Sequence, residues 1–295
     1  MYRLYTAVVA ILLLVMSAAA YAAGTNEPAP QKIVEDAKFV AKVEGREFLV
    51  NENGTWNKKF LKGVNIGVTK AGYFPGEFAI TKVEYLRWFR YISDMNADVM
   101  RVYTIQNPDF YDALLEFNKT AKRPLYLLQG VYLREDLIIK LENAYAHDAI
   151  IKQEFLTDAK HLVDIFHGNA KPPERLGYAS GDYKSDVSPY VIGWILGIEW
   201  DPMFVAKTNK WNSRRDYDGK YPYTENATPF EIFLCEVGDE VVSYEAEKYN
   251  IMRPVGYTNW LTTDLLKHEN EPFSSQEDKA TVNTEHIKHK LAFKP

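Results

Sequence analysis

Cysteine is almost absent from this chain. Cys235 is the only one in 295 residues, so no disulfide can form within the chain, and its place in an apolar helical pattern predicts a buried, inert thiol. Glycine-rich phosphate loops and a G-x-S-x-G nucleophile elbow are also missing. His286 and His289 lack an acidic or cysteine companion at metal-ligand spacing. The sequence therefore predicts neither a metal ion nor a cofactor.

The chain also lacks the excess of positive charge that is typical of nucleic-acid-binding proteins. Its formal net charge is -5 at pH 7, and 25% of its residues are charged against 46% hydrophobic, as in ordinary soluble globular domains. Aromatic residues are abundant, in contrast, at 14% of the chain, with 20 Tyr and 6 Trp. Such a content suits a surface that stacks on sugar rings, and it suits a large core equally well.

A long apolar run occurs at the N-terminus, over residues 7–16, after the single basic residue Arg3. Small residues at Ala20 and Ala22 form an A-x-A cleavage pattern, so residues 1–23 resemble a secretory signal peptide. An uncleaved membrane anchor is the alternative, because the apolar run approaches the length that spans a bilayer. In both cases we expect the rest of the protein to be exported to the periplasm, the cell surface or the medium.

The chain after this leader divides into a linker and one domain. Residues 24–38 begin as a polar segment that contains Pro28 and Pro30, a composition typical of flexible linkers. Residues 39–295 are expected to form a single domain, which would be membrane-anchored through the N-terminus if the leader is retained.

Short apolar strands alternate with amphipathic helices through most of this domain. An alternating segment at residues 39–61 predicts a small antiparallel β preamble at the bottom of a barrel. Strands are then expected at residues 60–67, 97–103, 124–130, 191–198 and 254–259. Helices are expected to begin at the capping residues Thr81, Asn107, Asp148 and Thr228. This alternation is typical of βαβ units in a parallel α/β sheet.

One stretch, residues 191–202, combines an apolar strand with an abrupt change of character at its end. The apolar run is followed directly by Glu199, Trp200 and Asp201. In a β/α barrel the catalytic residues stand at the C-terminal ends of strands, and partial burial beside aromatic rings favours the protonated form of a carboxyl group. Glu199 is therefore a candidate general acid for cleaving a glycosidic bond. The alternative is that Glu199 caps the strand and pairs with a surface cation.

Polar or aromatic residues stand at the ends of all five expected strands, and we expect them to line one face as a substrate site. These candidate substrate-binding residues are Asn65, Arg101, Tyr103, Gln129, Trp200, Tyr257 and Asn259. Further candidates for stacking on a sugar are Trp211, Tyr217, Tyr221 and Tyr223. Arg101 and Asn65 would orient carboxylates and sugar hydroxyls. The alternative is that polar residues fall in short strands by chance, with Arg101 a core cation paired with a neighbouring carboxylate.

Three segments resemble strands of a known enzyme family. Residues 60–65 (FLKGVN), 100–103 (MRVY) and 197–199 (GIE) are similar to the first, second and fourth strands of retaining glycoside hydrolases of clan A, especially the family-2-type catalytic domains. The resemblance implies a (β/α)8 TIM barrel and a two-carboxylate mechanism on a β-linked oligo- or polysaccharide, with Glu199 as general acid/base. The family usually has Asn before this glutamate, where this chain has Ile198.

The same resemblance leaves the second carboxylate unaccounted for. The clan carries its nucleophile on the seventh strand, whereas about five of eight strands are expected here, so the predicted barrel is incomplete and inactive or impaired. Asp264, Glu269 and Glu271 are conceivable replacements, but their polar surroundings are typical of solvated loops. Residues 101–103 and 253–257 also resemble β-glucanosyltransferases, so a transglycosylase of the same fold is one alternative. A non-catalytic carbohydrate-binding or scaffold protein is the other.

Overall fold

The computed structural model of the chain describes residues 33–271, 274–290 and 293. The expected leader, residues 1–23, and the first part of the expected linker lie outside the described residues. The last part of the linker belongs to the domain: the Val34 N–H donates to the Tyr221 hydroxyl (3.1 Å), and Ala37 packs in the same apolar cluster. No helix in the described ranges is long and apolar enough to cross a membrane.

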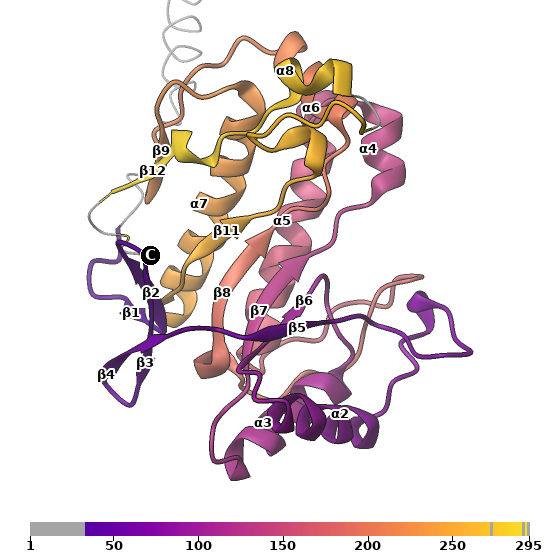
Figure 1. Ribbon diagram of the computed structural model, residues 1–295, viewed down its shortest axis with the longest axis vertical. Helices are drawn as coiled ribbons and strands as arrows, with labels where there is room; N and C mark the ends of the chain where they lie inside the picture. Colours follow the sequence, from indigo (N-terminus) through magenta and orange to yellow (C-terminus); the bar gives the residue numbers. More distant parts are fainter. Residues whose placement is uncertain (1–32, 272–273, 291–292, 294–295) are drawn as a thin grey trace, which may run out of the picture. The chain divides into compact units, whose positions relative to one another are not determined.

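Five parallel strands form the central sheet, and they lie side by side in chain order (Figure 1). They are β5 (Gly63–Ile66), β6 (Val99–Val102), β7 (Tyr126–Val131), β8 (Val191–Leu196) and β11 (Val255–Tyr257). The expected α/β class and its five parallel strands are therefore confirmed. β5 and β11 are the two edge strands, and the described residues show no pairing between them, so no barrel closure is found.

Four helices match the expected ones: α2 (Lys82–Asp94), α3 (Pro108–Thr120), α5 (Ala146–Phe166) and α7 (Pro229–Tyr249). Thr228 begins α7 with a capping box, in which its N–H donates to the Glu231 carboxylate (2.8 Å) and its hydroxyl accepts from the Glu231 N–H (3.3 Å). Asn107 caps α3 by accepting from the Phe110 N–H (3.3 Å). The expected start of α5 at Asp148 is wrong, because residues 147–149 have positive φ and regular helical geometry follows them.

The shorter elements were not predicted from the sequence, since helices of ten residues or fewer are too short to show a clear helical period. The missed helices are α4 (Glu135–Leu141), α6 (Pro202–Trp211) and α8 (Glu277–Ala280). The missed strands are β1 (Lys38–Phe39), which pairs with β10 (Ile251–Met252), and β9 (Pro222–Thr224), which pairs with β12 (Ile287–His289). The 3-10 helices are η1 (Pro75–Glu77), η2 (Ser188–Tyr190), η3 (Leu261–Thr263), η4 (Ser274–Gln276) and η5 (Thr284–His286). The segment after Trp260 is not simply a solvated loop, because Ala280 and Val282 are buried in the main core.

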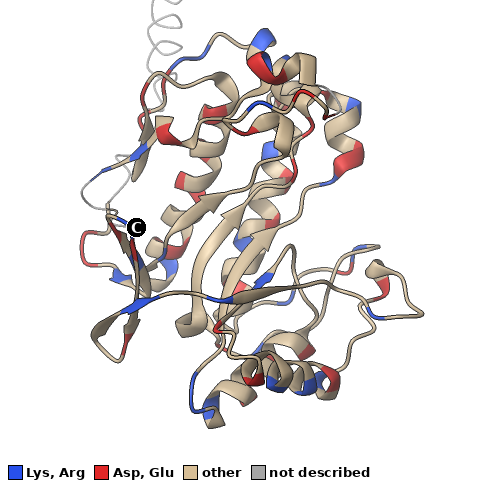
Figure 2. Ribbon diagram, viewed as in Figure 1, with Lys and Arg blue, Asp and Glu red and all other residues tan. Residues whose placement is uncertain are grey.

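Helices cover one face of the sheet, where they pack against alternate strand residues. Met100 and Val102 of β6, Leu127 of β7 and Trp194 of β8 share one apolar cluster with residues of α2, α3, α5 and α7. Successive side chains of a strand point to opposite faces, so the intervening residues face away from the helices. Figure 2 shows β7 and β8 without charged residues, as expected for strands in the interior of an α/β fold.

The opposite face is covered at the N-terminal ends of the strands by an antiparallel meander. The meander consists of β2 (Ala41–Glu44), β3 (Glu47–Glu52) and β4 (Thr55–Lys59). Its residues Ala41 and Val50 pack against Val99, Tyr126 and Ile192, which lie near the starts of β6, β7 and β8. The structure thus contains the expected antiparallel preamble, which packs near the N-terminal ends of the parallel strands.

Nearer the C-terminal ends of the strands this second face is accessible to solvent, and we call it the open face. Its residues, as the strand registers show, are Asn65, Arg101, Leu128, Gly130, Ile195 and Gly256. Asn65 is exposed, and Arg101, Ile195 and Gly256 are half-buried. The sheet therefore separates a helix-covered face from an open face. A side chain on the first contacts the helices, whereas a side chain on the second can contact a ligand from the solvent.

Cys235 lies on the buried side of α7, as the sequence predicted. Burial raises the pKa of its thiol well above the ordinary value, and the nearby carboxyl groups of Asp239 and Glu236 raise it further. We therefore expect the native protein not to react with Ellman's reagent at pH 8, and one thiol per chain to react after unfolding in urea. Rapid reaction of the native protein would show that α7 opens readily.

Candidate functional site

Glu199 lies beyond the end of β8, in the loop that leads into α6. β8 ends at Leu196, and Gly197 then turns the chain with a φ of +104°, a conformation that residues with side chains rarely adopt. A Cβ at Gly197 would also lie 2.7 Å from the Trp200 ring, which packs back over the turn. This turn directs the Trp200 ring into the core and leaves the Glu199 side chain exposed.

The two carboxylates of this loop have different surroundings. Asp201 is the N-cap of α6, and its Oδ1 accepts from the Phe204 N–H (2.8 Å). Glu199 is exposed, and its carboxylate has neither a hydrogen bond nor an ion pair with any described residue. Asp201 is therefore committed to the helix, whereas Glu199 is free to meet a ligand. The apolar surroundings expected of a general acid are not supplied by the described residues.

The structure brings three of the predicted site residues together: Asn65, Arg101 and Tyr103. Asn65 of β5 stands directly opposite Arg101 of β6 on the open face. The Arg101 guanidinium lies over the Tyr103 ring, 4.7 Å from its centroid. Among the described residues Arg101 has no ion pair, and its buried Nε has no hydrogen-bond partner. Arg101 is therefore not a core cation satisfied by a neighbouring carboxylate, and it can bind an anion or a hydroxyl oxygen on the open face.

Gln129 and Tyr257 point to the helix-covered face, away from the open face. Gln129 is fully buried; it accepts from the Tyr111 hydroxyl (3.2 Å) and donates to the Thr104 carbonyl (3.1 Å). The Tyr257 hydroxyl lies against α7, where the missing side chain of Gly238 leaves room for it. Burial raises the pKa of the Tyr257 phenol well above its ordinary value. The sheet itself separates these two side chains from Asn65.

Trp200 and Asn259 also have structural surroundings. Trp200 is fully buried, and its ring packs edge-on against Phe230 with the centroids 5.1 Å apart. The Asn259 amide donates to the Val282 carbonyl (3.3 Å), and its oxygen accepts from the Thr263 hydroxyl (3.0 Å). Both residues therefore hold the loops that follow the strands and are not free to bind a substrate.

The further stacking candidates are divided between core and surface. Tyr221 is buried, Tyr223 lies in β9 opposite Lys288 of β12, and the Tyr217 hydroxyl donates to Asp239 (2.8 Å). Burial raises the pKa of the Asp239 carboxyl group, although backbone N–H groups also donate to it. Trp211, on α6, is the most exposed of the four, with 52% of its surface accessible.

The three acids considered as replacement nucleophiles lie in the segment after β11. Asp264 hydrogen-bonds to the His268 ring (3.0 Å) and accepts from the Leu266 N–H (2.6 Å), so it serves its own loop. Glu269 is exposed and Glu271 is half-buried, in a turn where the Glu271 N–H donates to the His268 carbonyl (3.0 Å). Among the described residues none of the three forms a hydrogen bond with Glu199.

A cavity of about 400 Å³ lies over the C-terminal ends of β5, β6 and β7. Tyr103 is the predicted site residue that lines it, while Gln106, Tyr132 and Tyr178 in its wall were missed from the sequence. Tyr132 directly follows β7, so an aromatic residue just beyond an apolar strand was the available signal. Tyr178 gave no such signal, because it belongs to the long irregular loop between α5 and β8.

Known proteins add nothing to this geometry. No family model, curated protein or solved structure matches the chain. A function must therefore be inferred from the chain's own strands, side chains and cavities.

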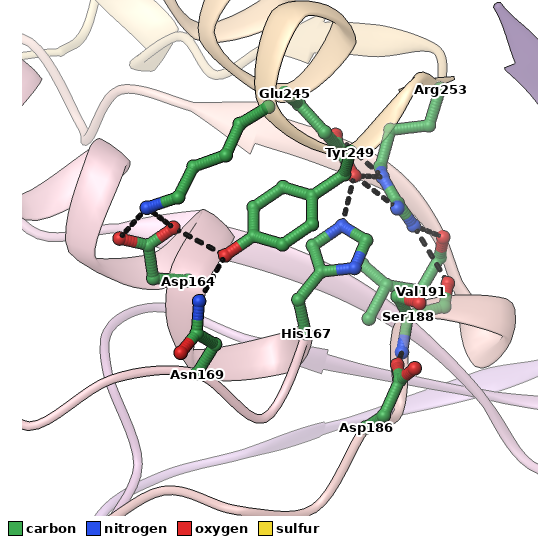
Figure 3. Close-up of polar contacts among 10 residues, drawn as sticks. Asp164, His167, Asn169, Asp186, Ser188, Val191, Glu245, Tyr249 and Arg253 are labelled. Carbon is green, nitrogen blue, oxygen red and sulfur yellow. Dashed lines mark hydrogen bonds and ion pairs between the residues drawn. The ribbon is translucent and has the colours of Figure 1, made fainter.

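A second polar cluster lies at the opposite, N-terminal ends of the strands (Figure 3). Arg253, which precedes β11, is fully buried and donates through Nε to both carboxylate oxygens of Glu245 on α7 (3.1 and 3.0 Å). Its Nη1 donates to the carbonyl of Ser188 (3.1 Å) and to that of Val191 at the start of β8. His167, at the end of α5, hydrogen-bonds to the same carboxylate (3.0 Å). We call these residues the Arg253 cluster.

The Arg253 cluster keeps Glu245 ionised and ties together elements far apart in the sequence. Burial raises the pKa of Glu245, but the charge of Arg253 and the hydrogen bonds from His167 and Arg253 outweigh burial and lower it. The Tyr249 ring stacks on His167, with centroids 3.8 Å apart, and its hydroxyl donates to Asp164 (2.7 Å). In parallel α/β folds the active site lies at the C-terminal ends of the strands, and residues at the N-terminal ends usually stabilise the fold. We therefore assign the Arg253 cluster to stability and not to catalysis.

Proposed function

We propose that the chain is a glycoside hydrolase-like protein built on an incomplete (β/α)8 barrel, with Glu199 as general acid/base towards a β-linked oligo- or polysaccharide. The observation that carries this proposal is the winding of the sheet: five parallel strands in chain order, with the helices on one face. In a doubly wound sheet the strand order reverses and helices cover both faces. Strands that follow in order with helices on one side are those that curl into a barrel.

The residues at the C-terminal ends of the strands suit the first half of a retaining reaction. Glu199 would give its proton to the glycosidic oxygen as the bond from that oxygen to the anomeric carbon breaks. Asn65 and Arg101 would orient sugar hydroxyls and a carboxylate on the open face. Ile198 cannot supply the hydrogen bond to the sugar 2-hydroxyl that asparagine gives in the family, so binding of the transition state is weaker.

The second carboxylate is the part of the mechanism that the described residues do not supply. The resemblance assigns the nucleophile to a seventh strand, whereas the described sheet has five strands. Retaining hydrolysis needs two carboxyl groups about 5–5.5 Å apart. We therefore expect slow hydrolysis or none from this chain alone.

External azide is expected to restore turnover of aryl β-glycosides. Azide attacks the anomeric carbon from the face opposite the leaving group, the bond to the aryl oxygen breaks, and Glu199 gives its proton to that oxygen. With phenyl β-glycosides, whose basic leaving group needs a proton, the wild-type chain should form α-glycosyl azides, and Glu199→Gln should lower the rate about 100-fold or more. The rate is measured as released phenol, and the product by NMR.

Glu44→Gln, which changes an exposed glutamate of the meander, is the matched control and should leave this rate unchanged. Equal rates for the wild-type chain and Glu199→Gln would rule out Glu199 as the acid. Strong turnover without azide would show that the chain already supplies a nucleophile.

The exposure of Glu199 favours a second candidate, a non-catalytic carbohydrate-binding protein, because acid catalysis gains from a desolvated carboxyl group. Glycan affinity that survives Glu199→Ala, without azide-dependent turnover, would select this candidate. A transglycosylase shares the chemistry of the first proposal and is recognised by lengthened glycan products. From the leader pattern we also propose that the protein is exported.

A further inference from the structure

The cavity over β5, β6 and β7 has walls from four separate parts of the chain. The loop between β5 and α2 contributes Pro75, Gly76 and Phe78, and the loop before β8 contributes Tyr178. Tyr103 and Tyr132, which follow β6 and β7, complete the wall. Its volume of about 400 Å³ lies within the range of roughly 300–1,000 Å³ that is usual for small-molecule sites.

The chemistry of these walls selects a neutral ligand with both apolar and hydroxyl surfaces. Among the residues that the structure describes, no charged residue lines the cavity, whereas four aromatic rings do: Phe78, Tyr103, Tyr132 and Tyr178. A tyrosine ring offers an apolar face for the C–H side of a pyranose and a hydroxyl for its rim. The cleft between α6 and α8 differs, since Lys207, Lys210 and Lys279 line it and would favour an anion.

Gln106 gives the cavity a buried polar group in need of a partner. Its side chain is fully buried, and its Oε1 accepts from the Tyr85 hydroxyl (3.2 Å). Its Nε2 has no hydrogen-bond partner among the described residues. A buried amide N–H without a partner is costly, so the wall favours an occupant that brings hydroxyl oxygens, directly or through a bound water.

The loops of the cavity are held in place by the protein itself. The Asn107 amide donates to the Phe78 carbonyl (3.0 Å) and to the Ile80 carbonyl (2.8 Å), which fixes the end of the β5–α2 loop. A Cβ at Gly76 would lie 3.0 Å from the Gly177 Cα, so the two loops touch through their backbones. A cavity held in this way loses little conformational entropy when a ligand enters it.

We propose that this cavity binds a neutral pyranose unit of a glycan at the C-terminal end of the sheet. The proposal rests on the proposed function for its ligand class, a glycan, and not for any catalytic step. The ligand's sugar faces stack on Tyr103 and Tyr132, and its hydroxyls pair with Gln106 and Thr104, which also line the cavity.

Binding of defined oligosaccharides tests this proposal without any need for turnover. The probes are cellotetraose, laminaritetraose and mannotetraose, with tetragalacturonate as an anionic counterpart, titrated into the full chain by calorimetry. We expect at least one neutral tetrasaccharide to bind, and the double variant Tyr103→Ala/Tyr132→Ala to weaken it at least about tenfold through the loss of two aromatic contacts. Both tyrosines are partly exposed, at 44% and 39%, so their removal should leave the fold intact, as circular dichroism will verify.

A matched control separates this site from the other surfaces. Tyr91→Ala removes an exposed tyrosine of α2 that does not line the cavity, and it should keep the wild-type affinity. Failure of all three neutral probes to bind, or equal affinity in the folded double variant, overturns the proposal. The proposal of a neutral ligand is also overturned if the chain binds tetragalacturonate and the double variant loses as much affinity for it as for the neutral tetrasaccharides. Binding of a neutral tetrasaccharide without azide-dependent turnover would contradict only the proposed hydrolase activity. Turnover without such binding would contradict only the proposed sugar site in the cavity.

Discussion

Replacing Arg253 by methionine is expected to lower the free energy of unfolding by about 3–5 kcal/mol, because it leaves the buried Glu245 carboxylate without its counter-charge. Both side chains are almost fully buried, at 1% exposure each. Arg253 also donates to the Ser188 carbonyl (3.1 Å), so the change leaves backbone acceptors at the start of β8 unpaired as well. The free energy of unfolding thus falls because a buried carboxylate and buried carbonyl oxygens lose their partners where water cannot replace them.

Urea unfolding followed by circular dichroism measures this effect. Lys184→Met is the matched control, since it removes the cation of the exposed Lys184–Asp182 pair and should change stability by less than about 1 kcal/mol. An Arg253→Met variant as stable as this control would show that the Arg253 cluster does not hold the fold together.

The pH dependence of the same pair of proteins gives a second check. In the wild-type chain the pKa of Glu245 is lowered, so its contribution to stability is complete above the ordinary glutamate pKa of about 4.3 and is lost as the pH falls through the folded-state value. In Arg253→Met burial acts without its main counter-charge, so protonation of Glu245 stabilises the variant as the pH falls. His167 faces the same carboxylate in both proteins. The stability difference should therefore shrink from pH 7 towards pH 4, and a difference independent of pH would contradict this account.

Trp200→Ala is expected to cost about 3–5 kcal/mol of stability, as for other large aromatic residues removed from a core. The Trp200 ring is fully buried and packs against Phe230 and Phe204, with centroids 5.1 and 6.2 Å away. It also closes over the Gly197 turn that leads to Glu199. A change in glycan binding by this variant would therefore follow from disorder in the loop and not from a lost stacking contact.

Trp211→Ala is the matched comparison, because this tryptophan is 52% exposed on α6. Its removal should change stability by no more than about 0.5 kcal/mol. Both variants are measured by urea unfolding. If the two substitutions had equal effects, Trp200 would not be part of the core.

The local sequence was sufficient to predict the helices and strands that are marked by a capping residue or by an apolar run. Thr228 and Asn107 marked the starts of α7 and α3, because a side chain that caps a helix needs only the residues that follow it. The apolar runs predicted all five strands of the sheet, and the position of Cys235 in such a pattern predicted its burial. α4 and α6 were missed, since each is too short for its apolar residues to show a clear helical period.

The candidate site was predicted less well than the fold. The sequence predicted correctly that the C-terminal ends of the strands meet at one edge of the sheet. The face of the sheet on which each side chain lies depends, however, on the register between neighbouring strands. Gln129 pairs with Val102 of β6, whose side chain packs against the helices, so Gln129 faces the helices as well. Arg101 pairs with Asn65 and shares the open face with it, whereas Tyr257 lies against α7. A register irregularity at Leu127 and Leu128 further shifts β8 against β7, and no local pattern reveals it.

The sequence by itself determined the order of strands and helices, because periodicity and capping act between residues that are close along the chain. The tertiary structure alone decided which distant groups meet. Arg253 with Glu245 and His167, and Tyr103 with Tyr132 and Tyr178, are brought together by the packing of separate βα units. The physical reason is that the partners of a buried charge, or the walls of a cavity, are set by the register and packing of whole strands and helices, which neighbouring residues do not encode.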